Sequence, residues 1–316
     1  MTEQQSQDLR VVMVQTFIDA VEGGIPLAVV VSDSTSTAKI KPFQELYPER
    51  LVNVGIAEQN LVGIAAGLSR GGFVPVTANA ACFLTTRAAE QVKNDICYSN
   101  TNVKLVGLNA GVCYGPLAST HHAIDDVSMM LGLGNILILA PSDPVDTAQI
   151  VRFALRYDGP VYIRMDSAKF PVIHKEDYRF EPGKADVLKT GTDITIITMG
   201  STAHHGYFAA EALKNDSIDA EVINISSVRP FDRDAVAESI AKTGKVITVE
   251  EHSLHGGLGS IVSDIIAAES LGVKLVKLGI PQGQFSKAGP RNEIQAYYKI
   301  DKNGIVETAR AMMEKD

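Results

Sequence analysis

The sequence has no surplus of basic residues and no basic run. Among its 316 residues, 29 are Lys or Arg and 37 are Asp or Glu, which gives a formal net charge of −8. Proteins that bind nucleic acids usually carry a basic patch that pairs with the phosphates. We therefore expect no nucleic-acid partner, whereas a phosphorylated small molecule needs only a few well-placed arginines.

Cysteine is scarce, and long apolar runs are missing. Cys82, Cys97 and Cys113 are an odd number of cysteines without CxxC spacing, which argues against a disulfide framework or a zinc knuckle and favours a reducing compartment. No apolar run reaches the ~18 residues of a membrane-spanning helix, and the polar opening MTEQQSQDLR is not a signal peptide. We therefore expect a cytoplasmic protein without a membrane partner.

Short apolar runs alternate with helical patterns along the chain. Continuous apolar runs are typical of strands that are buried on both faces of a parallel sheet. In the first half, the pattern predicts strands at residues 27–32, 51–54, 73–78, 103–110, 136–140 and 161–165. It predicts helices between them, near residues 11–21, 58–70, 86–97, 123–132 and 144–156.

The alternation lapses after Ser167, in a polar segment with two prolines, and then resumes. Strands are predicted at residues 193–200, 220–226, 245–251 and 273–279, and helices near 204–214, 232–242, 257–270 and 304–314. The pattern therefore predicts two successive α/β domains, over residues 1–172 and 191–316, with a linker at residues 173–190.

The segment at residues 51–68, LVNVGIAEQNLVGIAAGL, is the most informative. A strand followed by a turn at Gly55 places Glu58 in the first turn of a helix. Its carboxylate could simply stabilise the positive end of the helix dipole, by about 0.3–1 kcal/mol. However, Leu61 and Ala65 follow at helical spacing, so the carboxylate lies beside the apolar face. Burial there should raise its pKa, which suits an acid that holds and donates a proton near neutral pH.

NVGIAEQNLVGIAAGL resembles the glutamate-bearing segment of transketolase-like thiamine diphosphate enzymes. The resemblance continues through PVTANAACFLTTRAAEQVKND, GVCYGPLASTHHAIDD and GPVYIRMD, and then through the second domain. It implies a thiamine diphosphate pyrimidine-binding domain over residues 1–172 and a transketolase C-terminal domain over residues 191–316.

The resemblance also implies a set of cofactor-binding residues. Glu58 matches the catalytic acid that hydrogen-bonds N1′ of the aminopyrimidine and favours the tautomer that activates the thiazolium carbon. Ile56 and Phe83 match members of the wall around the pyrimidine, and ordinary core packing is their alternative role. Asp33 matches an acid of the cofactor pocket, with a turn or cap residue as the alternative.

Other matches imply contacts with the substrate. His121 matches the histidine of the substrate channel. Arg164 and Arg10 match arginines that hold the sugar phosphate through charge-assisted hydrogen bonds, although a surface ion pair would also explain either one. Ser36 and Thr37 could add hydroxyl donors to the same phosphate.

The chain departs from the family pattern near the substrate. Asn109 stands where two-substrate transketolases usually have a histidine, and Pro116 and Leu117 replace an acid pair. Because that acid normally reads a hydroxyl stereocentre, the resemblance does not define the sugar.

The cation-binding segment of the family is missing. Thiamine diphosphate enzymes hold the diphosphate through Mg²⁺ or another divalent cation at a GDG segment, and this sequence has none. The glycine-rich residues 255–260, HGGLGS, bring no suitable acid, and without a GxSxG segment they do not indicate a hydrolase. We expect no metal ligands in this chain. The resemblance implies that an N-terminal transketolase subunit carries the diphosphate-binding domain and the cation, in an α2β2 heterotetramer.

The function implied is that of the C-terminal subunit of a split transketolase, an enzyme that transfers a two-carbon ketol unit between phosphorylated ketose and aldose sugars. Two other enzymes stay open: the β subunit of a 2-oxo acid decarboxylating complex, and a deoxyxylulose-phosphate synthase-like enzyme, although the latter normally carries all its domains on one chain. A catalytically silent assembly subunit is the non-enzymatic alternative, which Glu58 within an intact motif disfavours.

Overall fold

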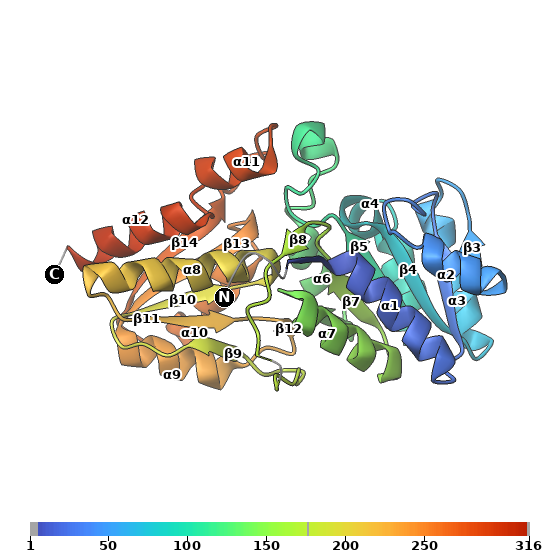
Figure 1. Cartoon of the computed structure of the whole chain (residues 1–316), viewed down its shortest axis with the longest axis horizontal. Coiled ribbons are helices and arrows are strands. Elements are labelled where there is room, and N and C mark those ends of the chain that lie inside the picture. Colours follow the sequence, from blue (N-terminus) through green and yellow to red (C-terminus); the bar gives the residue numbers. More distant parts are fainter. Residues whose placement is uncertain (1–5, 176, 315–316) are drawn as a thin grey trace.

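Two mainly parallel sheets covered by helices lie end to end in this computed structural model, which describes residues 6–175 and 177–314 (Figure 1). The strands of the first sheet run in the order β12 (Ser227–Arg229), β6 (Leu137–Leu139), β7 (Val161–Arg164), β5 (Lys104–Leu108), β4 (Val74–Ala80), β2 (Leu27–Val31) and β3 (Leu51–Asn53). Only β12 is antiparallel to its neighbour.

The second sheet has the order β14 (Lys274–Ile280), β13 (Lys245–Ser253), β10 (Ile194–Thr198), β11 (Ala220–Asn224) and β9 (Asp186–Lys189). Here β9 is the antiparallel edge strand. A separate antiparallel pair, β1 (Gln7–Asp8) and β8 (Lys169–Phe170), lies between the two sheets in Figure 1.

Helices pack on both faces of each sheet. On the first sheet, one face is covered by α1 (Leu9–Glu22), α2 (Lys41–Leu46) and α7 (Pro144–Arg156), and the other by α3 (Glu58–Arg70), α4 (Ala81–Thr86), α5 (Ala89–Gln91), the π-helical η3 (Val92–Tyr98) and α6 (Asp126–Leu131). On the second sheet, α8 (Ala203–Leu213) and α12 (Lys302–Met313) cover one face, and α9 (Arg233–Thr243) and α10 (Leu258–Ala268) the other. One apolar cluster runs from Leu61 in α3 to Val262 in α10, so the two domains share a core.

Shorter elements complete the chain. They are α11 (Arg291–Tyr297) and the 3-10 turns η2 (Pro48–Arg50), η4 (Gly115–Thr120), η5 (Gly200–Thr202) and η6 (Lys214–Asp216). Among the described residues, no helix is both long enough and apolar enough to cross a membrane.

The predicted fold class is confirmed, and the differences concern short elements. Residues 186–189 of the predicted linker form β9, whose half-buried residues lack a continuous apolar run. The strand β12 follows the first strands of the second domain in sequence but extends the first sheet. The helix predicted near 86–97 corresponds to α5 and the π-helical η3, and a separate short helix, α4, ends just before them at Thr86. The Thr85 and Thr86 hydroxyls donate to main-chain carbonyls at the end of α4, where such bonds compete with the helix. The domain boundaries at residues 172 and 191 stay predictions.

A buried histidine ties the linker to both domains. The ring nitrogens of His174 lie 3.0 Å from Asp143 Oδ2, at the start of α7, and 2.9 Å from Asp186 Oδ2, in β9. Burial lowers the pKa of His174, but the two carboxylates outweigh that effect and raise it to about 10. His174 is therefore a buried cation at neutral pH.

We expect His174→Gln to lower the free energy of unfolding by about 3 kcal/mol near neutral pH, because breaking a buried ion pair leaves uncompensated charge. A raised histidine pKa stabilises the fold fully below the unfolded value of about 6.5. That contribution disappears as the pH rises through about 10. Urea unfolding at several pH values should show the difference between wild type and variant shrinking from pH ~7 to ~10. The exposed His255→Gln is the control, and a difference that stays constant with pH contradicts this account.

Candidate functional site

The start of α3 lies at the sheet edge where parallel strands end. After β3 ends at Asn53, Gly55 adopts a φ of +73° and α3 begins at Glu58. The Asn53 side chain accepts hydrogen bonds from the backbone N–H groups of Asp33 and Gly55, each at 3.0 Å. The loops after β2 and β3 are therefore held together at the edge where α/β sheets bind ligands.

Glu58 is buried beside a charged partner that the sequence analysis missed. Glu58 is 2% exposed, and its Oε2 accepts a hydrogen bond from Arg87 Nη1 at 2.6 Å. Burial acts to raise the pKa of Glu58, but the Arg87 hydrogen bond, with further hydrogen bonds from the backbone and Asn79, lowers it overall. The predicted rise in pKa is therefore wrong for this state of the chain. Glu58 is an ionised, enclosed carboxylate.

A series of ring contacts extends from the Arg87 side of the Glu58–Arg87 pair. The Arg87 guanidinium carbon lies 4.5 Å from the centre of the Phe83 ring. On Phe83, the ring of His121 packs edge-on with a centroid distance of 5.2 Å, and Tyr114 packs on His121 at 5.3 Å. The structure therefore brings together three residues predicted from different motifs: Glu58, Phe83 and His121.

Ile56 and Asp33 lie on the two loops that Asn53 joins. Ile56 is 77% exposed, so the core-packing alternative is wrong for this residue. Asp33 is exposed and has a φ of +55°, a conformation that non-glycine residues adopt rarely. An exposed isoleucine, an aromatic ring and a buried carboxylate together suit a flat nitrogen heterocycle, and the residues present fit the pyrimidine half of thiamine diphosphate.

A second cluster gathers around Arg10. Its Nη1 donates to the Thr37 carbonyl at 2.9 Å, and Nη2 lies 2.7 Å from Asp8 Oδ2. Lys39 also contacts Asp8, at 3.2 Å, while Ser36 is exposed beside Thr37. The predicted residues Arg10, Ser36 and Thr37 therefore share one surface with a second cation.

Arg164 does not join this surface. Its side chain is 2% exposed, and its Nε lies 2.9 Å from Oδ2 of the fully buried Asp126. Its Nη2 donates to the carbonyls of Ala123, at 3.3 Å, and of Glu251 in the second domain, at 2.9 Å. Both predicted roles, phosphate contact and surface ion pair, need correction: Arg164 is enclosed and fixes the domain interface, so it is not accessible to a sugar phosphate.

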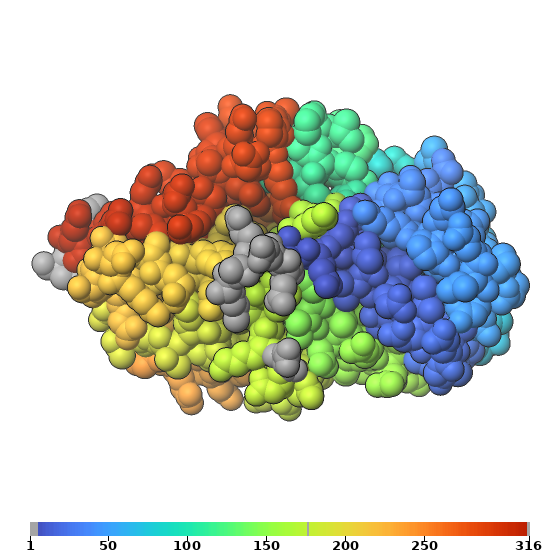
Figure 2. Space-filling view, viewed as in Figure 1, coloured from blue at the N-terminus to red at the C-terminus, as the bar shows by residue number. Residues whose placement is uncertain are grey.

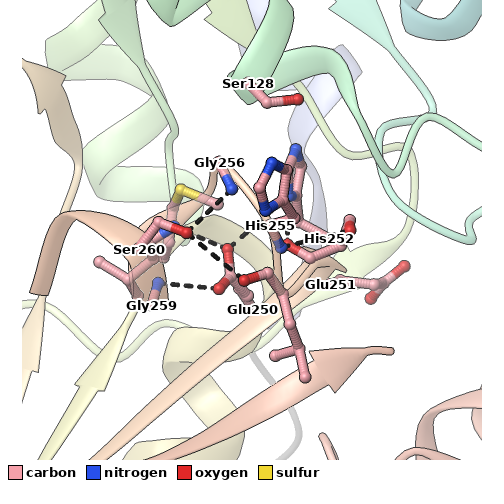
Figure 3. Close-up of polar contacts among 12 residues, drawn as sticks. Ser128, Glu250, Glu251, His252, His255, Gly256, Gly259 and Ser260 are labelled. Atoms are coloured by element: carbon pink, nitrogen blue, oxygen red, sulfur yellow. Dashed lines mark hydrogen bonds and ion pairs between the residues drawn. The ribbon is translucent and has the colours of Figure 1, made fainter. Parts of the chain in front are cut away.

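The glycine-rich residues 255–260 lead into α10, which begins at Leu258, and most of their amides are already hydrogen-bonded within the chain (Figure 3). The carboxylate of Glu250 accepts hydrogen bonds from the backbone N–H groups of Leu258, at 2.7 Å, and Gly259, at 2.8 Å. A Cβ on Gly257 would lie 2.0 Å from Glu250 Oε2. This segment is therefore a closed structural turn rather than a cradle for a phosphate or an oxyanion. Within residues 6–175 and 177–314, no group of three His, Cys, Asp or Glu side chains could hold a metal ion.

Two domain families match this arrangement. Residues 5–171 match the transketolase pyrimidine binding domain, and residues 183–305 match the transketolase C-terminal domain. The chain belongs to the transketolase family. The resemblance predicted from the sequence is thereby confirmed, as is the order of the two α/β domains.

Other members of the transketolase family align over most of the chain. One subunit of the apulose-4-phosphate transketolase of Actinobacillus succinogenes is 50% identical over 307 residues, which are 97% of this chain and 99% of that protein. The corresponding subunit from Phocaeicola vulgatus is 38% identical and spans 92% of each chain. A solved structure described as "Split gene transketolase, inactive beta4 tetramer" has a TM-score of 0.88 at 34% identity, over 96% of this chain and 97% of that one.

Arg87 and Tyr114 are the members of the site that sequence reasoning missed. Arg87 follows Phe83 by four residues, a spacing that places two side chains on one face of a helix, so the motif held a signal for their contact. The pairing of Arg87 with Glu58, 29 residues earlier, had no such signal.

We expect Arg87→Met to raise the pKa of Glu58, because burial then acts without the opposing guanidinium. Carbon NMR titration of the glutamate carboxyl groups would measure the shift, and Glu58→Gln would identify the resonance. The matched control is Arg70→Met, at the exposed end of α3. An unchanged Glu58 pKa in Arg87→Met would contradict the electrostatic role given to Arg87.

Proposed function

We propose that this chain is the pyrimidine-binding subunit of a split, thiamine diphosphate-dependent transketolase. It would transfer a two-carbon ketol unit between phosphorylated ketose and aldose sugars when paired with a diphosphate-binding subunit. The observation that carries the proposal is the buried Glu58 carboxylate beside Phe83 and His121, at the ligand-binding edge of the first sheet.

The chain's own residues would bind and tune the cofactor. When bound, thiamine diphosphate supplies the carbon nucleophile that carries the ketol unit. Phe83 and Ile56 would pack on the pyrimidine, and Glu58 would hold a proton between its carboxylate and a ring nitrogen. Sharing that proton requires a higher carboxyl pKa than Arg87 allows. Because 47% of the Arg87 side chain is exposed, it can withdraw toward solvent as the cofactor binds.

Arg10 and His121 are proposed to face the substrate. Arg10 and the neighbouring Lys39 share the single carboxylate of Asp8, which leaves one net positive charge for a phosphate group, with Ser36 and Thr37 as hydroxyl donors beside them. Apulose 4-phosphate is the first sugar to assay, since the Actinobacillus succinogenes relative is named for it. Arg164 has no part in this proposal.

The proposed partner supplies the diphosphate site and its divalent cation, in an α2β2 assembly. The two apulose-4-phosphate relatives are each named as one subunit of a transketolase, and the split-gene neighbour is described as an inactive β4 tetramer. Both observations support a division of the active site between two polypeptides. The described residues include no cluster that could hold the cation.

In the assembled enzyme, Glu58→Gln should lower the turnover number for ketol transfer by at least about 10²–10⁴-fold, the usual range for losing an acid–base group. Coupled assays with apulose 4-phosphate and other ketose phosphates would measure it. The thermal midpoint of unfolding should change little, because glutamine keeps the volume of the side chain and its amide oxygen can still accept the hydrogen bond from Arg87.

Glu90→Gln is the control, since Glu90 is exposed and its carboxylate accepts hydrogen bonds from two neighbours on its own helical segment, Gln91 and Asn94. Near wild-type turnover in Glu58→Gln would overturn the catalytic assignment. Absence of ketol transfer by the wild-type pair on every sugar phosphate would overturn the function.

A further inference from the structure

The loop that carries His121 is pinned at its base and projects from the first domain. Gly111 and Ala123 form an antiparallel bridge, with backbone hydrogen bonds of 3.0 and 2.9 Å between them. Between these residues the chain forms η4 and then turns back. In Figure 1 this loop stands beside α11 of the second domain, and in Figure 2 the two segments lie directly against each other.

One contact with the second domain is made by the residue next to His121. The His122 Nδ1 atom lies 2.5 Å from the Ser286 hydroxyl, and both residues are more than nine-tenths buried, at 4% and 6% exposure. The other ring nitrogen, Nε2, contacts the Gly115 carbonyl at 3.0 Å. The Ser119 hydroxyl also donates to the Ser286 carbonyl, at 3.3 Å. Ser286 therefore contacts the loop at two places: at Ser119, near the end of η4, and at His122, just after it.

The base of the same loop is held by a second contact with the second domain. Glu251, in β13, accepts a hydrogen bond from the Val112 N–H at 2.8 Å and also pairs with Arg291, at the start of α11. Gly115 approaches the segment before α11 so closely that a Cβ on Gly115 would lie 2.8 Å from the Gly289 carbonyl oxygen. The loop is therefore packed on the segment at residues 286–291 along its length.

The backbone inside the loop needs such support. Ala118 has a φ of +57° and a ψ of −155°, a region that non-glycine residues rarely occupy. The N–H groups of His121 and His122 both donate to the Ala118 carbonyl, at 2.9 Å each, so this strained residue sets the direction of both histidines. His121 packs on Phe83 and Tyr114, while His122 packs on the second domain.

We propose that Ser286 and His122 are positioning residues through which the C-terminal domain sets the placement of His121 for ketol transfer. The proposal rests on the proposed function for its catalytic consequence but on the contacts above for the anchoring itself. The second domain would thus contribute to substrate binding without touching the substrate, because it holds the loop that carries His121.

Ser286→Ala is the test, with Ser286→Thr as the variant that keeps the hydroxyl. Ser263→Ala is the matched control, because the Ser263 hydroxyl donates to Gly259 within α10, away from the loop. Hydrogen–deuterium exchange of the full chain, read on peptides that span residues 113–123, reports loop order without any need for activity. Exchange should become faster in Ser286→Ala, stay near wild type in Ser286→Thr, and be unchanged in Ser263→Ala.

Steady-state kinetics of the complex with the partner subunit provide the second readout. Loss of a buried hydrogen bond should lower kcat/KM for the ketose phosphate about tenfold in Ser286→Ala, mainly through KM. The affinity for thiamine diphosphate should remain unchanged, and Ser286→Thr should restore most of kcat/KM. Unchanged loop exchange in Ser286→Ala, or faster exchange with unchanged kcat/KM, would overturn the proposal. If exchange is faster in Ser286→Ala but the wild-type complex shows no ketol transfer, the anchoring is supported and the proposed function is refuted.

Discussion

The buried carboxylate of Glu58 constrains how the ligand-binding edge of the first domain is arranged. At 2% exposure, an ionised carboxylate needs a charged or hydrogen-bonding partner, because an uncompensated buried charge is strongly unfavourable. Arg87 provides one at 2.6 Å and at the same time covers the Phe83 ring. The groups proposed to bind the pyrimidine are therefore engaged by a side chain of the same chain. Under the proposed function, a cofactor must compete with this guanidinium for Glu58. This competition favours an isolated subunit that is catalytically inactive.

Buried charges also explain how the two domains keep one relative placement. Arg164 pairs with Asp126 and reaches the Glu251 carbonyl across the interface. Arg291 crosses the interface in the other direction, from α11 to Asp166, while the Glu251 carboxylate of its own domain also accepts a hydrogen bond from it. Removing one partner from a buried pair commonly costs about 3–5 kcal/mol, so these contacts resist rearrangement. A rigid interface is what allows the C-terminal domain to hold the loop that carries His121.

Most of the fold and part of the site could be predicted from the sequence, for physical reasons that differ between residues. Buried parallel strands need continuous apolar runs, so the sequence pattern predicts β2 and β10. It does not predict the half-buried edge strand β9, which lacks such a run. Glu58 was found because its motif is local. The roles of Arg87 and Arg164 depend on partners 29 and 38 residues away in sequence, which no local pattern encodes. For that reason the position of Arg164 at a strand end indicates a phosphate-binding residue, although Asp126 neutralises its charge inside the protein.

The central claim, an active site divided between two polypeptides, is tested most directly by calorimetric titration of the isolated chain with thiamine diphosphate and Mg²⁺. Stacking and one carboxyl hydrogen bond offer about 2–4 kcal/mol, far less than the ~8 kcal/mol of micromolar binding. The diphosphate has no cation site among the described residues to offset its desolvation. The account predicts no micromolar binding by the chain alone and micromolar binding once the partner subunit is added. Micromolar, Mg²⁺-dependent binding by the isolated chain would contradict it.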